Sequence, residues 1–134
     1  MFGLFKREDP DRRGMREEFE AVTRQLRSAS PATQIAVGHA VNLANSLFRK
    51  SFGTVSFQTL STAEQIAYID QLSVMETKLR EVNNDLPGSL GFGLFKMWVG
   101  AVAAKDQPLM ELMSKELSYF SSQGDLSLLV GALE

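Results

Sequence analysis

The pattern of hydrophobic and polar positions predicts a chain made almost entirely of helices, arranged around one apolar stretch. Residues 90–104 carry one charged side chain, Lys96, and hold the only tryptophan, Trp98. As a helix these residues reach about 22 Å, short of the roughly 30 Å hydrocarbon core of a bilayer. A lysine near the middle of a membrane span is also costly. The pattern therefore predicts a central apolar helix around 89–104, buried in a compact all-α bundle.

A second helix is expected over about 31–50, where a serine and a proline form a typical helix start. Small residues recur at every fourth position of this segment, and they are Ala32, Ala36, Ala40 and Ala44. Small side chains allow two helix axes to approach closely. We therefore expect this alanine row to pack against the glycines of the central helix.

The first helix is expected over 15–29, and its apolar positions form one narrow stripe. The stripe recurs at i, i+4, i+7 and i+11 and consists of Met15, Phe19, Val22 and Leu26. A stripe of this width is typical of a coiled-coil seam, and it packs either on the body of the protein or on another chain. Phe19, Val22 and Leu26 are therefore candidate partner-binding residues.

Two further long helices are expected over about 62–84 and 106–122, each after a capping signal. The apolar positions of the first of these predict a buried face made of Ile66, Ile69, Leu72, Met75, Leu79 and Val82. Residues 51–60 lack a helical period and include residues that favour extended backbone. We predict a loop with a short extended piece there, with Phe52 and Phe57 filling the bundle.

The C-terminal residues predict a short additional helix, which completes a bundle of about five main helices. Gly124 is typical of a residue that ends a helix, and Asp125 would cap the final segment. The large apolar residues of this segment share one side and are Leu126, Leu129, Val130 and Leu133. Because such a side is rarely left exposed on a monomer, it either docks on the body, which we favour, or binds a partner. These four residues are retained as candidate partner-binding residues.

Residues 1–14 are expected to form a flexible segment ahead of a single helical domain that spans 15–134. An apolar patch of Phe2, Leu4 and Phe5 precedes a charged run, and it either docks on the body or makes a membrane contact. The gain from burying these side chains is offset by the cost of ordering the chain. Interleaved acidic residues also weaken attraction to anionic lipid, so membrane binding through these three candidate residues is expected to be weak.

Composition narrows the functional classes. The chain of 134 residues has a formal net charge of -2 and contains no cysteine. The charge balance argues against nucleic acid as a partner. The lack of cysteine excludes thiolate metal sites and fits a reducing, cytoplasmic location. Phosphate-binding and zinc-protease motifs are absent, and a single histidine does not supply a metal centre. We therefore expect no enzyme activity, no metal and no cofactor.

The only histidine, His39, shares one side of its helix with Asn42 and Ser46. This polar stripe is either a solvent-facing seam or part of a binding site. A cavity near Trp98 would be lined by adaptable methionines and would suit a small apolar molecule. The candidate ligand-pocket residues are His39, Asn42, Met97, Trp98 and Met113. Filling of the core is the simpler role for the methionines.

The function that these features favour is a non-catalytic helical protein–protein interaction module, such as an adaptor, chaperone, inhibitor or regulatory subunit. It would bind a protein partner or a second copy of itself. The supporting features are the narrow stripe on the first helix and the apolar C-terminal segment, both suited to contact with another helix. Two alternatives stay open: a helical bundle that binds a small apolar ligand, and a peripheral membrane protein that attaches through Phe2 and Phe5.

Overall fold

Six α-helices make up the part of the chain that the structure describes. The structure is a computed structural model that describes the backbone of residues 10–133 and the side chains of residues 13–124. The helices are α1 (Pro10–Arg27), α2 (Pro31–Ser51), α3 (Thr54–Gln58), α4 (Thr62–Glu81), α5 (Leu86–Ala104) and α6 (Gln107–Leu133). No strand occurs between residues 10 and 133, and the predicted all-α fold is confirmed.

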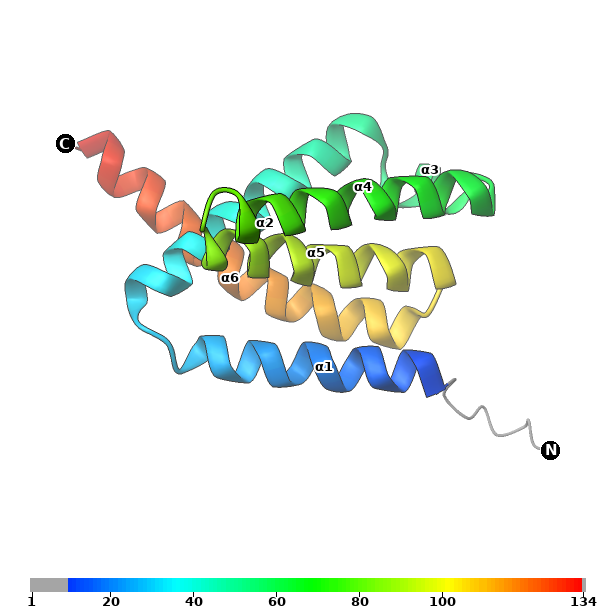
Figure 1. The fold of residues 1–134 in the computed structure, drawn as a ribbon, viewed down its shortest axis with the longest axis horizontal. Coiled ribbons are helices and arrows are strands. Elements are labelled where there is room, and N and C mark those ends of the chain that lie inside the picture. The colour runs from blue at the N-terminus through cyan, green and yellow to red at the C-terminus, as the bar shows by residue number, and fades with distance from the viewer. Residues whose placement is uncertain (1–9, 134) are drawn as a thin grey trace.

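The apolar helix α5 lies at the centre of the bundle, as predicted. In Figure 1, α4 and α6 lie on either side of α5, α1 lies beyond α6, and α2 crosses behind. Among the described helices, α5 alone is long and apolar enough to span a membrane, but 61% of that segment is buried inside the protein. α5 is therefore the core element onto which the amphipathic helices pack.

The predicted contact between the alanine row of α2 and a glycine of α5 is present. A Cβ atom built on Gly91 would lie 2.6 Å from the Cβ atom of Ala40 and 2.7 Å from the carbonyl oxygen of Val37. The two helices approach this closely only because residue 91 has no side chain. Ala44 of the same row is fully buried, whereas the first two alanines lie nearer the surface.

The segment predicted as a loop contains the short helix α3 and part of an aromatic cluster. Phe57 is fully buried, and its ring centroid lies 5.5 Å from that of Phe48 and 5.7 Å from that of Tyr68. The buried side chain of Gln65 donates a hydrogen bond of 2.8 Å to the Phe57 carbonyl oxygen. Phe52 and Gly53 have extended backbone, so the predicted short extended piece is present at the start of the segment. Residues 54–58, some of which favour extended backbone, form α3 instead, because these tertiary contacts outweigh that local preference. Phe52 and Phe57 do fill the bundle, as expected.

The observed buried face of α4 differs from the predicted one. Leu72 and Gln65 are the buried residues of this helix, whereas Ile66, Met75 and Val82 are exposed. The prediction for these three residues is therefore wrong. The apolar period alone did not reveal that a polar residue, Gln65, is buried where it donates a hydrogen bond to α3.

Lys96, the only charged residue of α5, pairs with Glu76 of α4. This pair contributes to the difference between the predicted and observed buried faces of α4. Lys96 Nζ lies 2.6 Å from Glu76 Oε1 and donates a second hydrogen bond of 3.3 Å to Ser73 Oγ. Both charged side chains are half-buried, and a charge is tolerated in such a place only when it is paired. Glu76 and Ser73 therefore face α5, and apolar neighbours on α4 are turned toward solvent.

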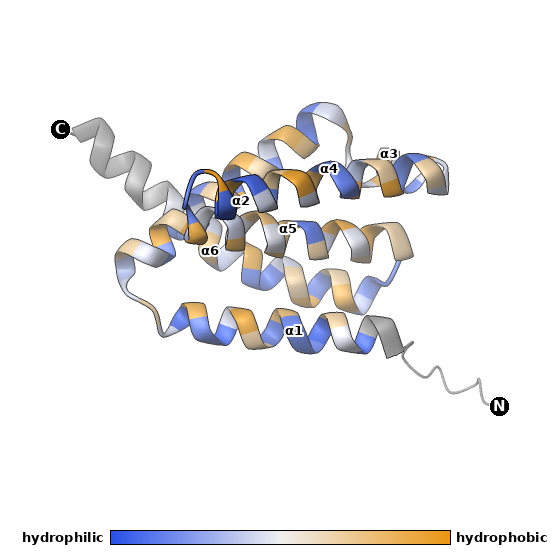
Figure 2. Ribbon diagram, viewed as in Figure 1, coloured by the Kyte–Doolittle hydropathy of each residue, from blue (hydrophilic) through white to orange (hydrophobic). Residues whose placement is uncertain are grey.

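α1 begins at Pro10 instead of the predicted residue 15, and it continues through Gly14. Blue and orange segments alternate along α1 in Figure 2, as expected of an amphipathic helix. Its apolar stripe faces the body, since Phe19 is fully buried, Leu26 is nearly so, and Val22 packs against the core. The sequence left two contacts possible for this stripe, the body of the protein or another chain. In the structure the stripe contacts the body of its own chain.

α6 is one continuous helix through Gly124, so the predicted helix end and the separate short helix are wrong. A Cβ atom on Gly38 of α2 would overlap the carbonyl oxygen of Phe120 and lie 2.5 Å from the backbone nitrogen of Gly124. A Cβ atom on Gly124 would lie 2.6 Å from the carbonyl carbon of Gly38. The backbones of α2 and α6 touch here, and Gly124 permits close packing instead of ending the helix.

Candidate functional site

The side of α2 that faces α6 carries a stripe of polar and small residues. The stripe follows helical spacing and consists of Gln34, Gly38, Asn42, Asn45 and Arg49. The neighbouring side of α2, which faces α5, is formed by its buried apolar residues. The observed polar stripe therefore differs from the predicted one, which grouped Asn42 with His39 and Ser46.

α6 presents a row of serines to this stripe. Ser114, Ser118 and Ser121 recur at i, i+4 and i+7 of α6 and line the same cavity as Asn42, Asn45 and Arg49. The two helices run in opposite directions. The contacts of Gly38 with Gly124 and of Asn42 with Ser121 set a register that places Asn45 opposite Ser118 and Arg49 opposite Ser114.

The hydrogen bonds between the two polar rows end one turn beyond the glycine contact. One turn from the glycine contact, the Asn42 amide donates a hydrogen bond of 3.2 Å to the Ser121 carbonyl oxygen. The same amide accepts a hydrogen bond of 2.5 Å from the Ser121 hydroxyl. Further along, the side chains of Asn45, Ser118 and Arg49 form no hydrogen bond or ion pair with any residue that the structure describes. The helices thus enclose a groove that is closed at one end and open at the other.

α5 supplies the floor of this cavity, which we name the α2–α6 groove. The rings of Phe95 and Trp98 form the floor with their centroids 5.3 Å apart. The Trp98 indole nitrogen donates a hydrogen bond of 3.0 Å to the Ser114 hydroxyl oxygen, which fixes the position of the indole ring. Val41 and Leu117 complete the apolar part of the lining, and the cavity volume is about 220 Å³.

Two of the five predicted ligand-pocket residues, Asn42 and Trp98, line the α2–α6 groove. Met113 is fully buried and Met97 packs against the core, so both methionines fill the interior. His39 is half-buried on α2 and does not line the groove. The cavity beside Trp98 is therefore half polar, in contrast to the apolar, methionine-lined pocket that we expected.

The other polar lining residues of the groove were not predicted from the sequence. The spacing of Asn45 and Arg49 relative to Asn42 was visible, and so was the row of serines on the C-terminal helix. Each row lies on one side of its own helix, but spacing does not show which side meets another helix. The register between the two rows follows only from tertiary contacts, those of Gly38 with Gly124 and of Asn42 with Ser121.

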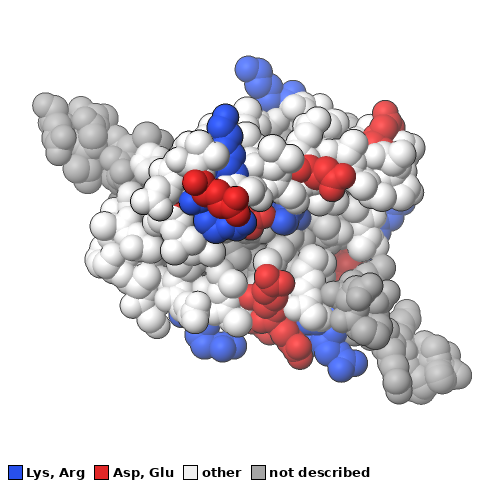
Figure 3. Space-filling view, in the orientation of Figure 1, with Lys and Arg blue, Asp and Glu red and all other residues white. Residues whose placement is uncertain are grey.

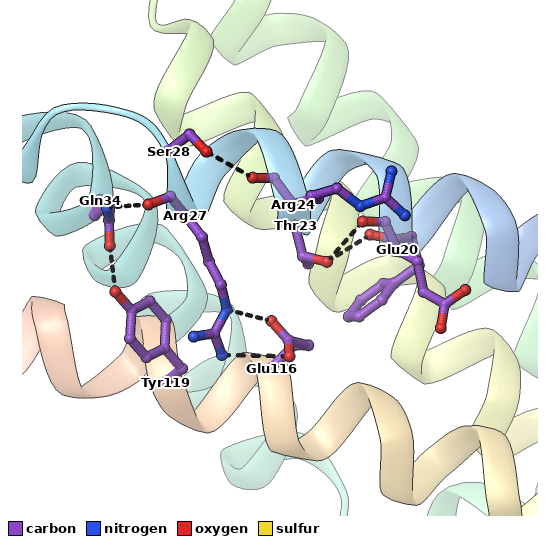
Figure 4. A network of polar contacts seen from close by, with 9 residues as sticks. Glu20, Thr23, Arg24, Arg27, Ser28, Gln34, Glu116 and Tyr119 are labelled. Atoms are coloured by element: carbon purple, nitrogen blue, oxygen red, sulfur yellow. Dashed lines mark hydrogen bonds and ion pairs between the residues drawn. The ribbon is translucent and has the colours of Figure 1, made fainter.

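A polar network fastens the connection between α1 and α2 to α6 (Figure 4). The Arg27 guanidinium forms hydrogen bonds of 3.0 and 3.3 Å with the Glu116 carboxylate and stacks 3.8 Å from the centre of the Tyr119 ring. The Tyr119 hydroxyl donates a hydrogen bond of 2.6 Å to Gln34 Oε1. Gln34 Nε2 in turn donates to the carbonyl oxygens of Arg27 and Ala29. Since these groups bond to one another, the network holds the helices together.

The predicted partner-binding and membrane-contact residues fall into three groups. Phe19, Val22 and Leu26 contact the body of their own chain and offer little free surface. The side chains of Leu126, Leu129, Val130 and Leu133 lie outside the described side chains, although the helix that carries them is described. Phe2, Leu4 and Phe5 lie outside the described residues altogether.

The chemistry available in the groove consists of hydrogen-bond donors, apolar surface and one charge. Arg49 is the one charged residue among those that line it. Among the described residues, no three His, Asp or Glu side chains gather closely enough to hold a metal ion. On the described part of the face in Figure 3, positive and negative side chains are interspersed and leave wide uncharged areas. Comparison with protein-family models, curated proteins and solved structures gives no match.

Proposed function

We propose that this protein is a non-catalytic interaction module whose C-terminal helix binds a protein partner. The observation that supports the proposal is the continuity of α6, which passes Gly124 without a break and reaches Leu133. Residues 125–133 extend about 13 Å along the helix axis, whereas α2 begins only about 10 Å from its contact at Gly38. The end of α6 runs past the end of the bundle in Figure 1.

The sequence of this projecting end has the spacing of a helix that binds in an apolar groove. Its large apolar residues recur at i, i+3, i+4 and i+7 and are Leu126, Leu129, Val130 and Leu133. Amphipathic helices use this spacing to insert one face into a partner. Leu128 falls on the opposite side of the same helix. The partner that fits this helix is a protein with an apolar groove between helices. A second copy of this chain is the other candidate partner to test.

A matched pair of substitutions tests the proposal. Leu129→Glu places a charge on the proposed binding side, and Leu128→Glu places the same charge on the opposite side one residue away. Each full-length variant is used to capture partners from native lysate, and its mass in solution is measured by light scattering. We expect Leu128→Glu to retain the partner bound by the unmodified chain and Leu129→Glu to lose it, because a buried unpaired charge is strongly disfavoured.

Melting temperatures separate partner binding from docking on the body. Both variants should melt within a few degrees of the unmodified chain, since a substitution outside the packed body changes stability by about 0.5 kcal/mol or less. A fall in melting temperature in Leu129→Glu alone would mean that this side packs on its own bundle. Equal capture by the two variants would contradict the proposal. A dimer that only Leu129→Glu dissociates would identify the partner as a second copy.

A further inference from the structure

We infer that the open end of the α2–α6 groove binds a small organic carboxylate whose apolar body is about the size of one ring. This site lies between α2, α5 and α6, away from residues 125–133, so the inference does not rest on the proposed function. Three observations carry it: hydrogen-bond donors without partners among the described residues, an aromatic floor held in place, and a volume that suits one ring with a carboxylate.

The polar groups at the open end are donors that lack partners among the described residues. The Arg49 guanidinium offers five N–H groups, the Asn45 amide offers two, and the Ser118 hydroxyl offers one. No Asp or Glu occurs among the described residues that line the groove. A planar guanidinium can bind both oxygens of a carboxylate at once, and the neutral donors beside it would complete the recognition.

The floor of the groove suits a flat apolar group. Trp98 is only 7% exposed, and its hydrogen bond to Ser114 holds the indole in place before any ligand arrives. Since Phe95 is 2% exposed, a ligand ring would contact only the small accessible parts of the two rings, and it would gain from this edge contact. The groove volume of about 220 Å³ exceeds the roughly 150 Å³ of a cavity that holds benzene. It lies below the range of about 300–1,000 Å³ that is typical for larger ligands.

A loss of binding on substitution of Arg49 would have a second explanation if Arg49 only stabilised the end of α2. Lys50 provides the control for this structural role. Both residues lie in the last turn of α2, where a cation interacts favourably with the helix dipole. Arg49 lines the groove and Lys50 does not. Neutralising either residue removes the same dipole interaction, but only the change at Arg49 removes a cation from the proposed site.

Phenylacetate is a suitable probe, and phenylacetamide is its neutral counterpart. The single tryptophan gives one indole N–H signal in a proton–nitrogen NMR spectrum, and this signal reports directly from the floor of the groove. We expect phenylacetate to shift it saturably, with a Kd of about 1 mM or lower for a ligand of this size. Arg49→Gln should weaken binding at least about tenfold, as loss of a charge-assisted bidentate contact implies, and Lys50→Gln should change it less than about twofold.

Three results would overturn the inference: no saturable shift with phenylacetate, equal binding of phenylacetamide, or equal weakening by the two neutralised variants. Circular dichroism melts establish whether each variant is folded. Should Arg49→Gln prove unstable, the backbone signals of the unmodified chain decide the question. Shifts confined to residues 41–49, 95–98 and 114–121 support the site, and shifts spread over the bundle or located elsewhere contradict it.

Discussion

On the side of α2 that faces α5, apolar residues pack around Phe48, whereas on the side that faces α6, polar residues line an open groove. Phe48 is fully buried, and its ring centroid lies within 6 Å of five other rings: Phe52, Phe57, Tyr68, Phe95 and Trp98. On the other side, Asn45 and Arg49 have no partner among the described residues. One helix thus meets two neighbours in opposite ways.

The difference shows how a small bundle can combine stability with an open surface. Both interfaces depend on a glycine at which helix backbones approach closely, Gly91 toward α5 and the Gly38–Gly124 pair toward α6. Against α5, large rings continue the contact to the far end of α2. Against α6, the facing side chains are asparagine, arginine and serine, which are too small or too hydrophilic to fill the space between the helices.

The largest expected effect comes from removing the centre of the apolar interface. Phe48→Ala should lower the free energy of unfolding by about 3–5 kcal/mol, because it leaves a cavity among the aromatic rings. Leu47→Ala is the control, since this neighbouring side chain is largely exposed and should cost less than about 1 kcal/mol. Urea denaturation followed by circular dichroism measures both. Similar losses in the two variants would contradict the assignment of Phe48 as the centre of the interface.

A smaller but clear loss is expected from separating α2 and α6. Gly38→Ala should lower the free energy of unfolding by about 1–3 kcal/mol, because the new Cβ atom would meet backbone atoms of α6 that cannot move independently. Gly14→Ala in α1 is the matched control, as nothing lies within 4 Å of a Cβ atom there. That variant should gain about 0.5–1 kcal/mol from improved helix propensity. A neutral Gly38→Ala in thermal melts would mean that α2 and α6 are not in backbone contact.

Within the polar interface itself, stability should depend on one pair. Asn42→Ala removes both hydrogen bonds to Ser121 and should cost about 1 kcal/mol. Asn45→Ala, one turn further along the groove, should change stability by less than about 0.5 kcal/mol, since its side chain has no partner among the described residues. Chemical denaturation of both variants tests this gradient. An equal cost at the two positions would indicate that the groove is closed along its length.

The smallest expected effect is a change with pH on the apolar side. Burial raises the pKa of the Tyr68 phenol in the aromatic cluster above its ordinary value of about 10. The folded state therefore holds this proton more tightly than the unfolded state, so the contribution to stability is complete below the unfolded pKa. It is lost as pH rises through the folded pKa. In a Tyr119→Phe background, phenolate absorbance should appear at higher pH in the folded protein than in urea; coincident titrations would contradict this.

The sequence alone predicted most of the fold, because helix periodicity and capping residues are local signals. The buried central helix, the alanine row and the filling role of Phe52 and Phe57 are all seen in the structure. For the candidate site, the sequence pointed to Asn42 and Trp98 but also to three residues outside the groove lining. Residue type showed which side chains suit a ligand, but it did not show which of them converge.

What the sequence by itself determined is where the helices lie and which of them is buried, because those properties depend on residues close together in the chain. What only the tertiary structure decided is how each helix is turned toward its neighbours. Lys96 is paired with Glu76 of α4. This pair contributes to an orientation of α4 in which part of its predicted apolar face lies toward solvent. Gly124 has the local signature of a helix end, yet α6 continues through it and packs closely on Gly38 at this point. The contact between these two glycines, with that of Asn42 and Ser121, brings the polar rows of α2 and α6 face to face at the groove.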